Sequence, residues 1–273
     1  MMIQILEVNS KPIHTLKLSE FEQGILIKKE RSPVTYYYNT LEDLNFELKM
    51  RSRIVEAAKA LNLSGVDFAI FEHSRCNEQF WLRARNGGFQ LRPDVLPSDA
   101  IQDIFQQGKL YAFECSAAIV IILYKATLDV IGREAFNAYF QDLFIWDWNY
   151  DNDLKLVAKH NNREVYPGDI LYFKNPDHDP KMLEWQGENV ILLADDQYYG
   201  HGIGIRSAQE IIDTLNKARV PGSTTSAFLT EDVIHPDFEY LRSLAINGHY
   251  PMWGNRDGGT VVATIGAQVY VSK

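Results

Sequence analysis

Cys115 is the residue best placed for nucleophilic chemistry, because it stands where a strongly apolar segment begins. The run CSAAIVIILYK (115–125) has no polar face over its first turns, which is typical of a buried helix. At the start of such a helix, free backbone N–H groups and the positive end of the dipole favour a thiolate and can bind an oxyanion. Buried unreactive cysteines are also common, so position alone favours a structural role.

A thiol-based acyl transfer also needs a histidine that shares the thiol proton and a group that orients this histidine. His201 lies in YGHGIG (199–204), which we predict to be a strand whose glycines leave space beside the imidazole. The alternative interpretation of His201 is a structural histidine that is hydrogen-bonded at a bulge. Glu188 directly precedes an apolar strand and is the candidate orienting group, although a surface glutamate fits the same position.

Strand geometry predicts how these two residues meet. If Asp195 and Asp196 form a two-residue turn, Val190 faces His201 and Glu188 lies diagonal to His201 on the same sheet face. We therefore expect Glu188 to accept the N–H of His201 and to hold the ring toward Cys115. A register shift of one residue would send the two side chains to opposite faces.

Side chains around this constellation are candidates for substrate binding. Glu114 as an anion raises the pKa of its neighbour Cys115, so it either contacts a substrate amine or caps the helix. Trp185 is close in sequence to Glu188 and is expected to wall an acyl tunnel. Tyr172 and Tyr199 are expected to extend this apolar passage for the methylenes of a lysine.

The elements that carry these residues indicate an α+β fold. A capping box at Thr40 and Asp43 opens a helix that ends near Gly65, and a second capping box at Ser207 opens another. Strands are expected at 169–174, 189–193, 198–205, 227–229 and 261–271, and a loop at 247–259. Helices come first and strands later, so we predict a central apolar helix packed on one antiparallel sheet, within a single catalytic domain spanning 1–273 whose core is roughly 40–230.

Composition excludes several classes of protein. The formal net charge is −9, which disfavours nucleic acid as a partner. The most apolar stretch, 117–124, is too short to span a bilayer, so no membrane association is expected. We find no signal peptide, so we expect synthesis and retention in the cytoplasm, where the two cysteines do not form a disulfide framework.

Three segments carry a resemblance to a known family. YAFECSAA (111–118), WQGENVILL (185–193) and GHGIG (200–204), with the flanking runs FEL (46–48) and LYFKNP (171–176), resemble the Bacillus-type spore protein-glutamine γ-glutamyltransferases. The resemblance covers roughly residues 40–230. The tail beyond Thr230 resembles only some longer members of the family.

The resemblance implies acyl transfer from a protein glutamine to a lysine amine, with loss of ammonia and formation of an ε-(γ-glutamyl)lysine crosslink through a cysteine thioester. It implies Cys115 as nucleophile, completed by His201 and Glu188, on a papain-like or NlpC/P60-like core. It further implies no calcium or other cofactor, glutamine- and lysine-bearing spore coat proteins as partners, and synthesis in the mother cell followed by location in the spore coat.

Other motifs give weaker indications of function. His73 and Cys76 form half of a metal site with no second pair to complete it, and the aspartates at 147, 151 and 153 lack the pattern of a calcium loop, so no metal site is predicted. Two alternative functions remain at this stage. One is a cysteine hydrolase or peptidoglycan amidase that uses water as acceptor, and the other is a non-catalytic structural spore protein with an inert cysteine.

Overall fold

The structure is a computed structural model that describes residues 3–8, 10–160, 164–247, 261–265 and 268–272. Its helices are α1 (Glu20–Arg31), α2 (Leu41–Leu63), α3 (Pro97–Gln106), α4 (Cys115–Ile131), α5 (Arg133–Tyr139), α6 (Ala208–Lys217) and α7 (Phe238–Asn247). Its early strands are β1 (Ile3–Ile5), β2 (Tyr36–Tyr38), β3 (Asp67–Phe68), β4 (Trp81–Arg83), β5 (Phe89–Leu91), β6 (Ala112–Phe113) and β7 (Phe144–Ile145). Its later strands are β8 (Leu156–His160), β9 (Ile170–Lys174), β10 (Gly187–Ala194), β11 (Gln197–Gly200), β12 (Gly204–Arg206), β13 (Phe228–Leu229), β14 (Asp232–Pro236), β15 (Val261–Ile265) and β16 (Gln268–Ser272).

The main sheet is antiparallel and has the strand order β12-β11-β10-β9-β14-β8, with β13 also paired to β9. Because side chains alternate along a strand, each face of the sheet has its own core. On one face, Val190 and Leu192 of β10 pack with Ile211 and Leu215 of α6. On the other face, Ile191 and Leu193 of β10 belong to the larger core that contains α4. The fold is therefore the α+β arrangement that the sequence predicts, with a main antiparallel sheet.

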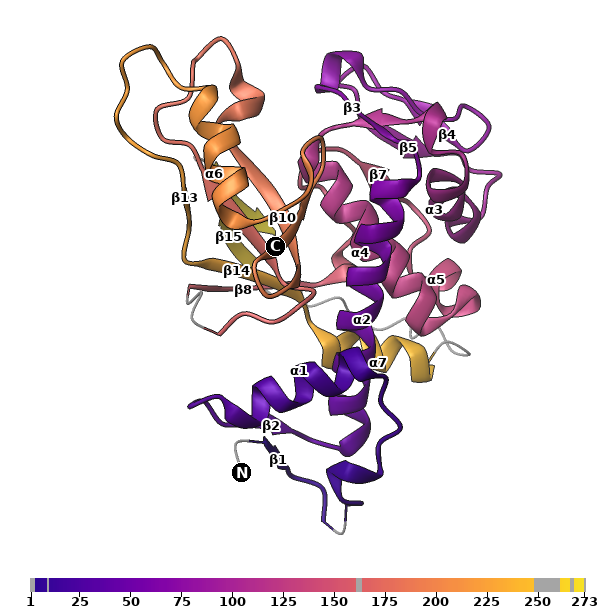
Figure 1. Cartoon of the computed structure of the whole chain (residues 1–273). Helices are drawn as coiled ribbons and strands as arrows, with labels where there is room; N and C mark the ends of the chain where they lie inside the picture. Colours follow the sequence, from indigo (N-terminus) through magenta and orange to yellow (C-terminus); the bar gives the residue numbers. More distant parts are fainter. Residues whose placement is uncertain (1–2, 9, 161–163, 248–260, 266–267, 273) are drawn as a thin grey trace.

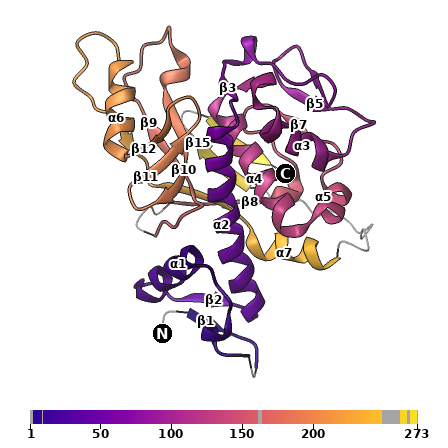
Figure 2. The same cartoon turned by 45° about the vertical axis from the view of Figure 1, so that its right-hand side comes forward.

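Helix α4 is the central element of this larger core. It packs against α2, β10, α3, α5 and α7, and Figures 1 and 2 show it between the main sheet and the smaller helices. Most of its side chains are fully buried, because its sequence is apolar on every side. Gly132, at a φ of 85°, ends it. None of the helices in the described part of the chain is long and apolar enough to cross a membrane.

A buried ion network joins α1 and α2 to the segment that precedes β9. Lys29 Nζ lies 2.8 Å from Glu47 Oε1, and Arg51 lies 2.7 Å from both Glu47 Oε1 and Asp169 Oδ1. Each of these four side chains is less than a tenth exposed. Paired in this way the charges fix how the N-terminal layer packs on the body of the molecule, whereas removal of one partner would leave a buried charge uncompensated.

Most of the predicted helix boundaries agree with the structure. Both capping boxes, Thr40 with Asp43 and Ser207 with Glu210, are formed, and Gly65 adopts the positive φ of a helix C-terminus. The strand pair β15 and β16 falls on the predicted 261–271 segment, and β16 ends one residue beyond it at Ser272. The predicted loop at 247–259 lies almost wholly outside the described residues.

Two predictions about the strands around His201 are wrong. Residues 198–205 do not form one strand, because β11 ends at Gly200 and His201 lies in the turn before β12. The β10–β11 register is also shifted. Ala194 pairs with Gln197 across Asp195 and Asp196 as expected, but an irregularity between Leu192 and Ala194 then places Val190 opposite Gly200 instead of His201. A bulge of this kind inserts one extra residue in one strand, and nothing in the turn sequence signals it.

Candidate active site

Cys115 is the first residue of α4 and is only 7% exposed. The short strand β6 leads directly into it, and Glu114 at the N-cap position has an extended backbone. The side chain of Asn189, on β10, donates a hydrogen bond from Nδ2 to Cys115 Sγ at 3.5 Å. The thiol therefore lies where the helix N-terminus meets the central strand of the sheet.

The resting thiol is less acidic than the helix position alone predicts. Burial raises the pKa of Cys115, and the carboxylates of Glu188 and Glu114 raise it further. Asn189 opposes this rise with its side-chain amide and its backbone N–H. Burial and the two carboxylates thus oppose the lowering of this pKa that is expected from the helix N-terminus. Ionisation of Cys115 therefore needs a group that takes its proton.

Glu188 is the carboxylate best placed to affect Cys115. It is 4% exposed, and its Oε1 atom has no hydrogen-bond partner among the described residues. Burial and then the charge of Glu114 raise its pKa well above the usual carboxyl range, while the backbone N–H of His201 lowers it. Gly200 leaves room for this carboxylate, since a Cβ at Gly200 would lie 2.7 Å from Glu188 Oε1. A raised pKa and an unpaired oxygen are properties of a proton acceptor.

The expected pairing of His201 with Glu188 and Cys115 is not present. The two ring nitrogens bond elsewhere, with Nδ1 3.1 Å from the Tyr199 hydroxyl and Nε2 3.2 Å from the Asp67 carbonyl oxygen. Burial lowers the pKa of His201 to about 4, so the ring is neutral at pH 7. The ring also stacks on Phe113, two residues before Cys115, with centroids 5.0 Å apart. The shifted register explains the difference, because His201 leaves the strand before it can lie diagonal to Glu188.

Three other candidates lie within electrostatic reach of the thiol. Burial raises the pKa of Glu114 to about 7, assisted by the charges of Asp147 and Glu184, and Ser116 Oγ donates to its carboxylate at 3.3 Å. Burial raises the pKa of Tyr172, and the charges of Cys115, Glu188 and Glu114 all add to this. The pKa of Tyr199 is raised by burial and then by Glu188 and Cys115. The structure thus brings these three residues to the site.

Trp185 and Cys76 occupy different surroundings. Trp185 ends a short 3-10 helix (Leu183–Trp185) before β10 and packs, half-buried, against the core on the α6 face of the sheet. Cys76 lies 4.0 Å from the Trp81 carbonyl, and burial raises its pKa to about 11. Among the described residues, His, Cys, Asp and Glu side chains form no group of three that could hold a metal ion.

Asn189 is a site residue that the sequence analysis missed. It is 6% exposed, its amide reaches the sulfur, and its Oδ1 has no partner in the described part of the chain. A signal was present in the sequence. Alternation puts Asn189 on the same face of β10 as Ile191 and Leu193, so it is the polar residue on an otherwise apolar face.

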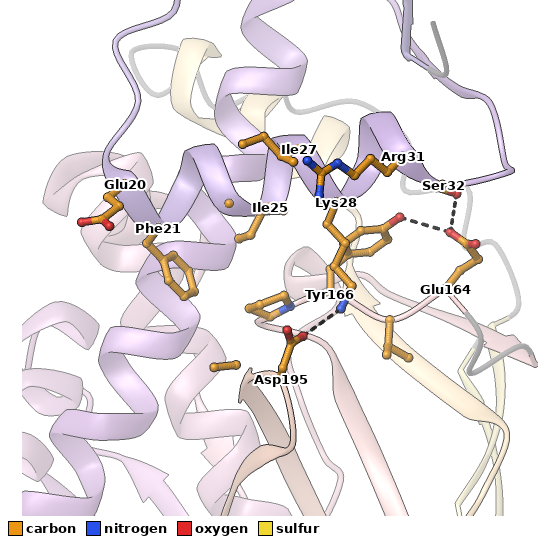
Figure 3. Close-up of a pocket in the computed structure, with 14 residues that line it drawn as sticks. Glu20, Phe21, Ile25, Ile27, Lys28, Arg31, Ser32, Glu164, Tyr166 and Asp195 are labelled. Carbon is orange, nitrogen blue, oxygen red and sulfur yellow. Dashed lines mark hydrogen bonds and ion pairs between the residues drawn. The ribbon is translucent and has the colours of Figure 1, made fainter.

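A separate groove of about 620 Å³ lies between α1 and the turn from β10 to β11 (Figure 3). Lys28 pairs with Asp195 across it at 3.3 Å, and Ser32 and Tyr166 donate to Glu164. None of the candidate catalytic side chains lines this groove. The site is therefore assigned from the buried thiol and its polar neighbours.

These features of the site define a class of enzyme. A thiol at the start of a buried helix, with a carboxylate of raised pKa and amide N–H donors beside it, is suited to acyl transfer through a covalent intermediate.

Comparison with known proteins identifies the family. The profile of the family described as protein-glutamine gamma-glutamyltransferase matches residues 2–245. The protein of that name from Bacillus pumilus (strain SAFR-032) is 44% identical over 237 residues, covering 87% of this chain and 96% of its own. The protein of that name from Bacillus cereus (strain B4264) is 42% identical over 239 residues, which cover 85% of this chain and 86% of its own.

A solved structure agrees with this assignment. It is described as the transglutaminase from Geobacillus stearothermophilus without its C-terminal extension. It matches with a TM-score of 0.72 and 53% identity, over 74% of this chain and 97% of that one. The chain belongs to the protein-glutamine gamma-glutamyltransferase family, and it is a transglutaminase.

Proposed function

We propose that this transglutaminase transfers the γ-glutamyl group of a protein glutamine to a protein lysine through a thioester on Cys115, with Glu188 as the proton acceptor. The observation that carries the proposal is the thiol at the start of α4, to whose sulfur Asn189 donates and whose pKa is raised by burial and then by the charge of Glu188. A thiol of raised pKa with a basic carboxylate nearby supports proton transfer during attack instead of a preformed thiolate.

In the first step the Cys115 thiol gives its proton to the Glu188 carboxylate as sulfur attacks the γ-carbonyl carbon. The C–S bond forms and the carbonyl electron pair moves to oxygen, where backbone N–H groups at the start of α4 stabilise the oxyanion. The C–N bond then breaks, and the proton on Glu188 passes to the leaving nitrogen. Ammonia departs and the thioester remains.

In the second step a neutral lysine amine attacks the thioester. The new C–N bond forms, the amine proton passes to Glu188, and the sulfur leaves and takes that proton back. Water competes for the same intermediate, so the site must favour amine by positioning and by excluding solvent. We propose this role for Tyr172 and Tyr199, with Glu114 contacting the lysine amine. The burial of both tyrosines next to the thiol supports it. Trp185 was expected beside them, but it packs against the core on the α6 face of the sheet, so it is not assigned to this passage.

His201 is proposed as a residue of the site that positions Cys115. It stacks on Phe113 and bonds to the Asp67 carbonyl, so it ties the turn after β11 to β6 and β3. A helix that begins with cysteine and packs on an antiparallel sheet supports a papain-like or NlpC/P60-like core. We further propose that residues 1–273 form one catalytic domain.

The spore coat is proposed as the place of action, with glutamine- and lysine-bearing coat proteins as substrates and synthesis in the mother cell. The resemblance of residues 111–118 and 185–193 to the spore enzymes supports this. We also propose that neither calcium nor another cofactor is needed. Amine incorporation should then be unchanged by a chelator, and coats from a strain without this protein should lose isopeptide crosslinks.

The direct test is incorporation of a labelled primary amine into a glutamine-containing protein. Cys115→Ala should abolish incorporation and ammonia release together, while Cys76→Ala should retain both. Incorporation that persists in Cys115→Ala would contradict the proposed nucleophile. Ammonia release at the same rate with and without amine, and without amine in the product, would show a hydrolase instead.

A further inference from the structure

The amide of Asn189 has one atom engaged at the thiol and one atom without a partner. Nδ2 donates to Cys115 Sγ at 3.5 Å, and Oδ1 is buried with no hydrogen bond in the described part of the chain. The oxygen and nitrogen of an amide group are roughly 2.2 Å apart, given bonds of about 1.23 and 1.33 Å. Oδ1 therefore lies within roughly 6 Å of the sulfur, given that 3.5 Å contact.

A buried oxygen without a hydrogen bond destabilises the folded protein, which favours binding of a ligand that donates to it. Asn189 is 6% exposed, and a buried acceptor without a donor loses its hydration with nothing in return. Oδ1 accepts hydrogen bonds, so the group that completes it must be a donor.

We propose that Asn189 Oδ1 binds the nitrogen that leaves and enters at the thioester carbon. The ligand class is a primary carboxamide in the first step, ammonia as it departs, and a primary amine in the second step. This inference rests on the proposed function, and it assigns Asn189 a role in selecting nitrogen over water. Because Nδ2 holds the sulfur, the same side chain sets the nitrogen against the carbon that the sulfur attacks.

The hydrogen bond between Asn189 Oδ1 and the substrate nitrogen should strengthen as the reaction proceeds. As the C–N bond breaks, the leaving nitrogen gains a proton and becomes a stronger donor, so its bond to Oδ1 strengthens toward the transition state. The attacking lysine amine follows the same path in reverse, and its N–H can point to Oδ1 as its lone pair faces the thioester. Water can donate to Oδ1 too, but it lacks the methylene chain that the buried tyrosines would hold. A substrate carboxylate offers no N–H and meets the negative field of Glu188 and Glu114.

Two substitutions separate the two halves of the amide. Asn189→Leu keeps the branched shape and removes both polar atoms, while Asn189→Asp keeps an acceptor and removes the donor. The matched control is Thr127→Val, which removes another buried unpartnered oxygen from α4, the helix of Cys115.

The assay loads the acyl-enzyme with an activated γ-ester of a glutamyl peptide, so that ammonia release does not limit acylation. The ratio of amine product to hydrolysis product is then measured with a lysine-analogue amine at fixed concentration. Asn189→Leu should lower this ratio at least tenfold, Asn189→Asp should keep it within about threefold of the wild type, and Thr127→Val should leave it unchanged. In parallel, ¹⁵N-ammonium should exchange into a glutamine peptide with the wild type and far less with Asn189→Leu.

A second measurement reports the reactivity of the Cys115 sulfur. Alkylation of Cys115 at pH 7 should slow about tenfold in both Asn189 variants, which is the factor for one pKa unit. Asn189→Ala replaces the leucine variant if that chain does not fold. An unchanged product ratio in Asn189→Leu, with alkylation slowed, would overturn the role of Oδ1. A ratio that falls equally in Asn189→Asp would do the same. Absence of any amine product with the wild type would instead overturn the proposed function.

Discussion

Substitution of Glu188 by glutamine should move the reactivity of Cys115 and the rate of catalysis in opposite directions. Glu188 is the first charge that raises the pKa of Cys115 after burial, so its removal should make the thiol more acidic. Two unit charges in a protein interact by ~4 kcal/mol at 4 Å and by ~2 kcal/mol at 8 Å with an effective dielectric constant near 20. Since about 1.36 kcal/mol equals one pKa unit, the pKa of Cys115 should fall by one unit or more.

Catalysis should fall in the same variant, because glutamine cannot accept the thiol proton. General bases contribute roughly 10²- to 10⁴-fold to such reactions, and a loss in this range is expected for amine incorporation. The assay compares the pH dependence of Cys115 alkylation between pH 6 and 10 with kcat/KM for amine incorporation. The control is Glu56→Gln, which removes an exposed carboxylate from α2.

A change of alkylation and catalysis in the same direction would contradict this role of Glu188. If Glu188→Gln slowed alkylation as well as catalysis, Glu188 would act by stabilising a thiolate, and the assignment as proton acceptor would be wrong. Full activity in Glu188→Gln would remove the residue from the mechanism altogether.

Three further predictions test the surroundings of the site and the fold. Gly200→Ala places a Cβ 2.7 Å from Glu188 Oε1 and should displace this carboxylate. Because the general base is then misplaced, kcat should drop at least tenfold in a protein that still folds, and a wild-type kcat would contradict this. Glu114→Gln removes an anion that raises the pKa of Glu188, so the carboxylate form persists to lower pH and the acid limb of kcat/KM should move down; an upward shift would contradict it. Arg51→Met leaves Asp169 buried without its partner and should cost about 3–5 kcal/mol in urea unfolding, whereas a loss below ~1 kcal/mol would show that the network is unimportant.

The elements that carry the site follow from local sequence signals. An apolar run that begins at Cys115 and ends at Gly132 predicts α4, because no alternative buries all of its sides. Capping boxes fix the starts of α2 and α6 in the same way. A third capping box, Ser19 with Glu22, opens α1, and it was available in the sequence but was not used. Helices were thus predictable because their signals lie within a few residues of one another.

The positions of the catalytic side chains depended on long-range geometry. One irregularity between Leu192 and Ala194 shifts the strand register, and the ring of His201 bonds to Tyr199 and Asp67 instead of Glu188. The pKa of Cys115 could be predicted only in part. The effect of its neighbour Glu114 was evident from the sequence, but burial and the charge of Glu188 on β10 depend on the tertiary fold. Asn189 was overlooked because its meaning lies in which face of β10 it occupies. Strand pairing and burial are properties of the whole chain, and a local pattern does not determine them.

Mass spectrometry of the acyl-enzyme can detect the proposed thioester on Cys115. The protein is mixed with a glutamine peptide in the absence of amine, quenched in acid, digested and analysed for the modified residue. We expect a mass increase equal to the peptide minus one ammonia, located on Cys115 and removed when a primary amine is added before the quench. Attachment at Cys76 or another residue, or steady amine incorporation by the Cys115→Ala protein, would contradict it.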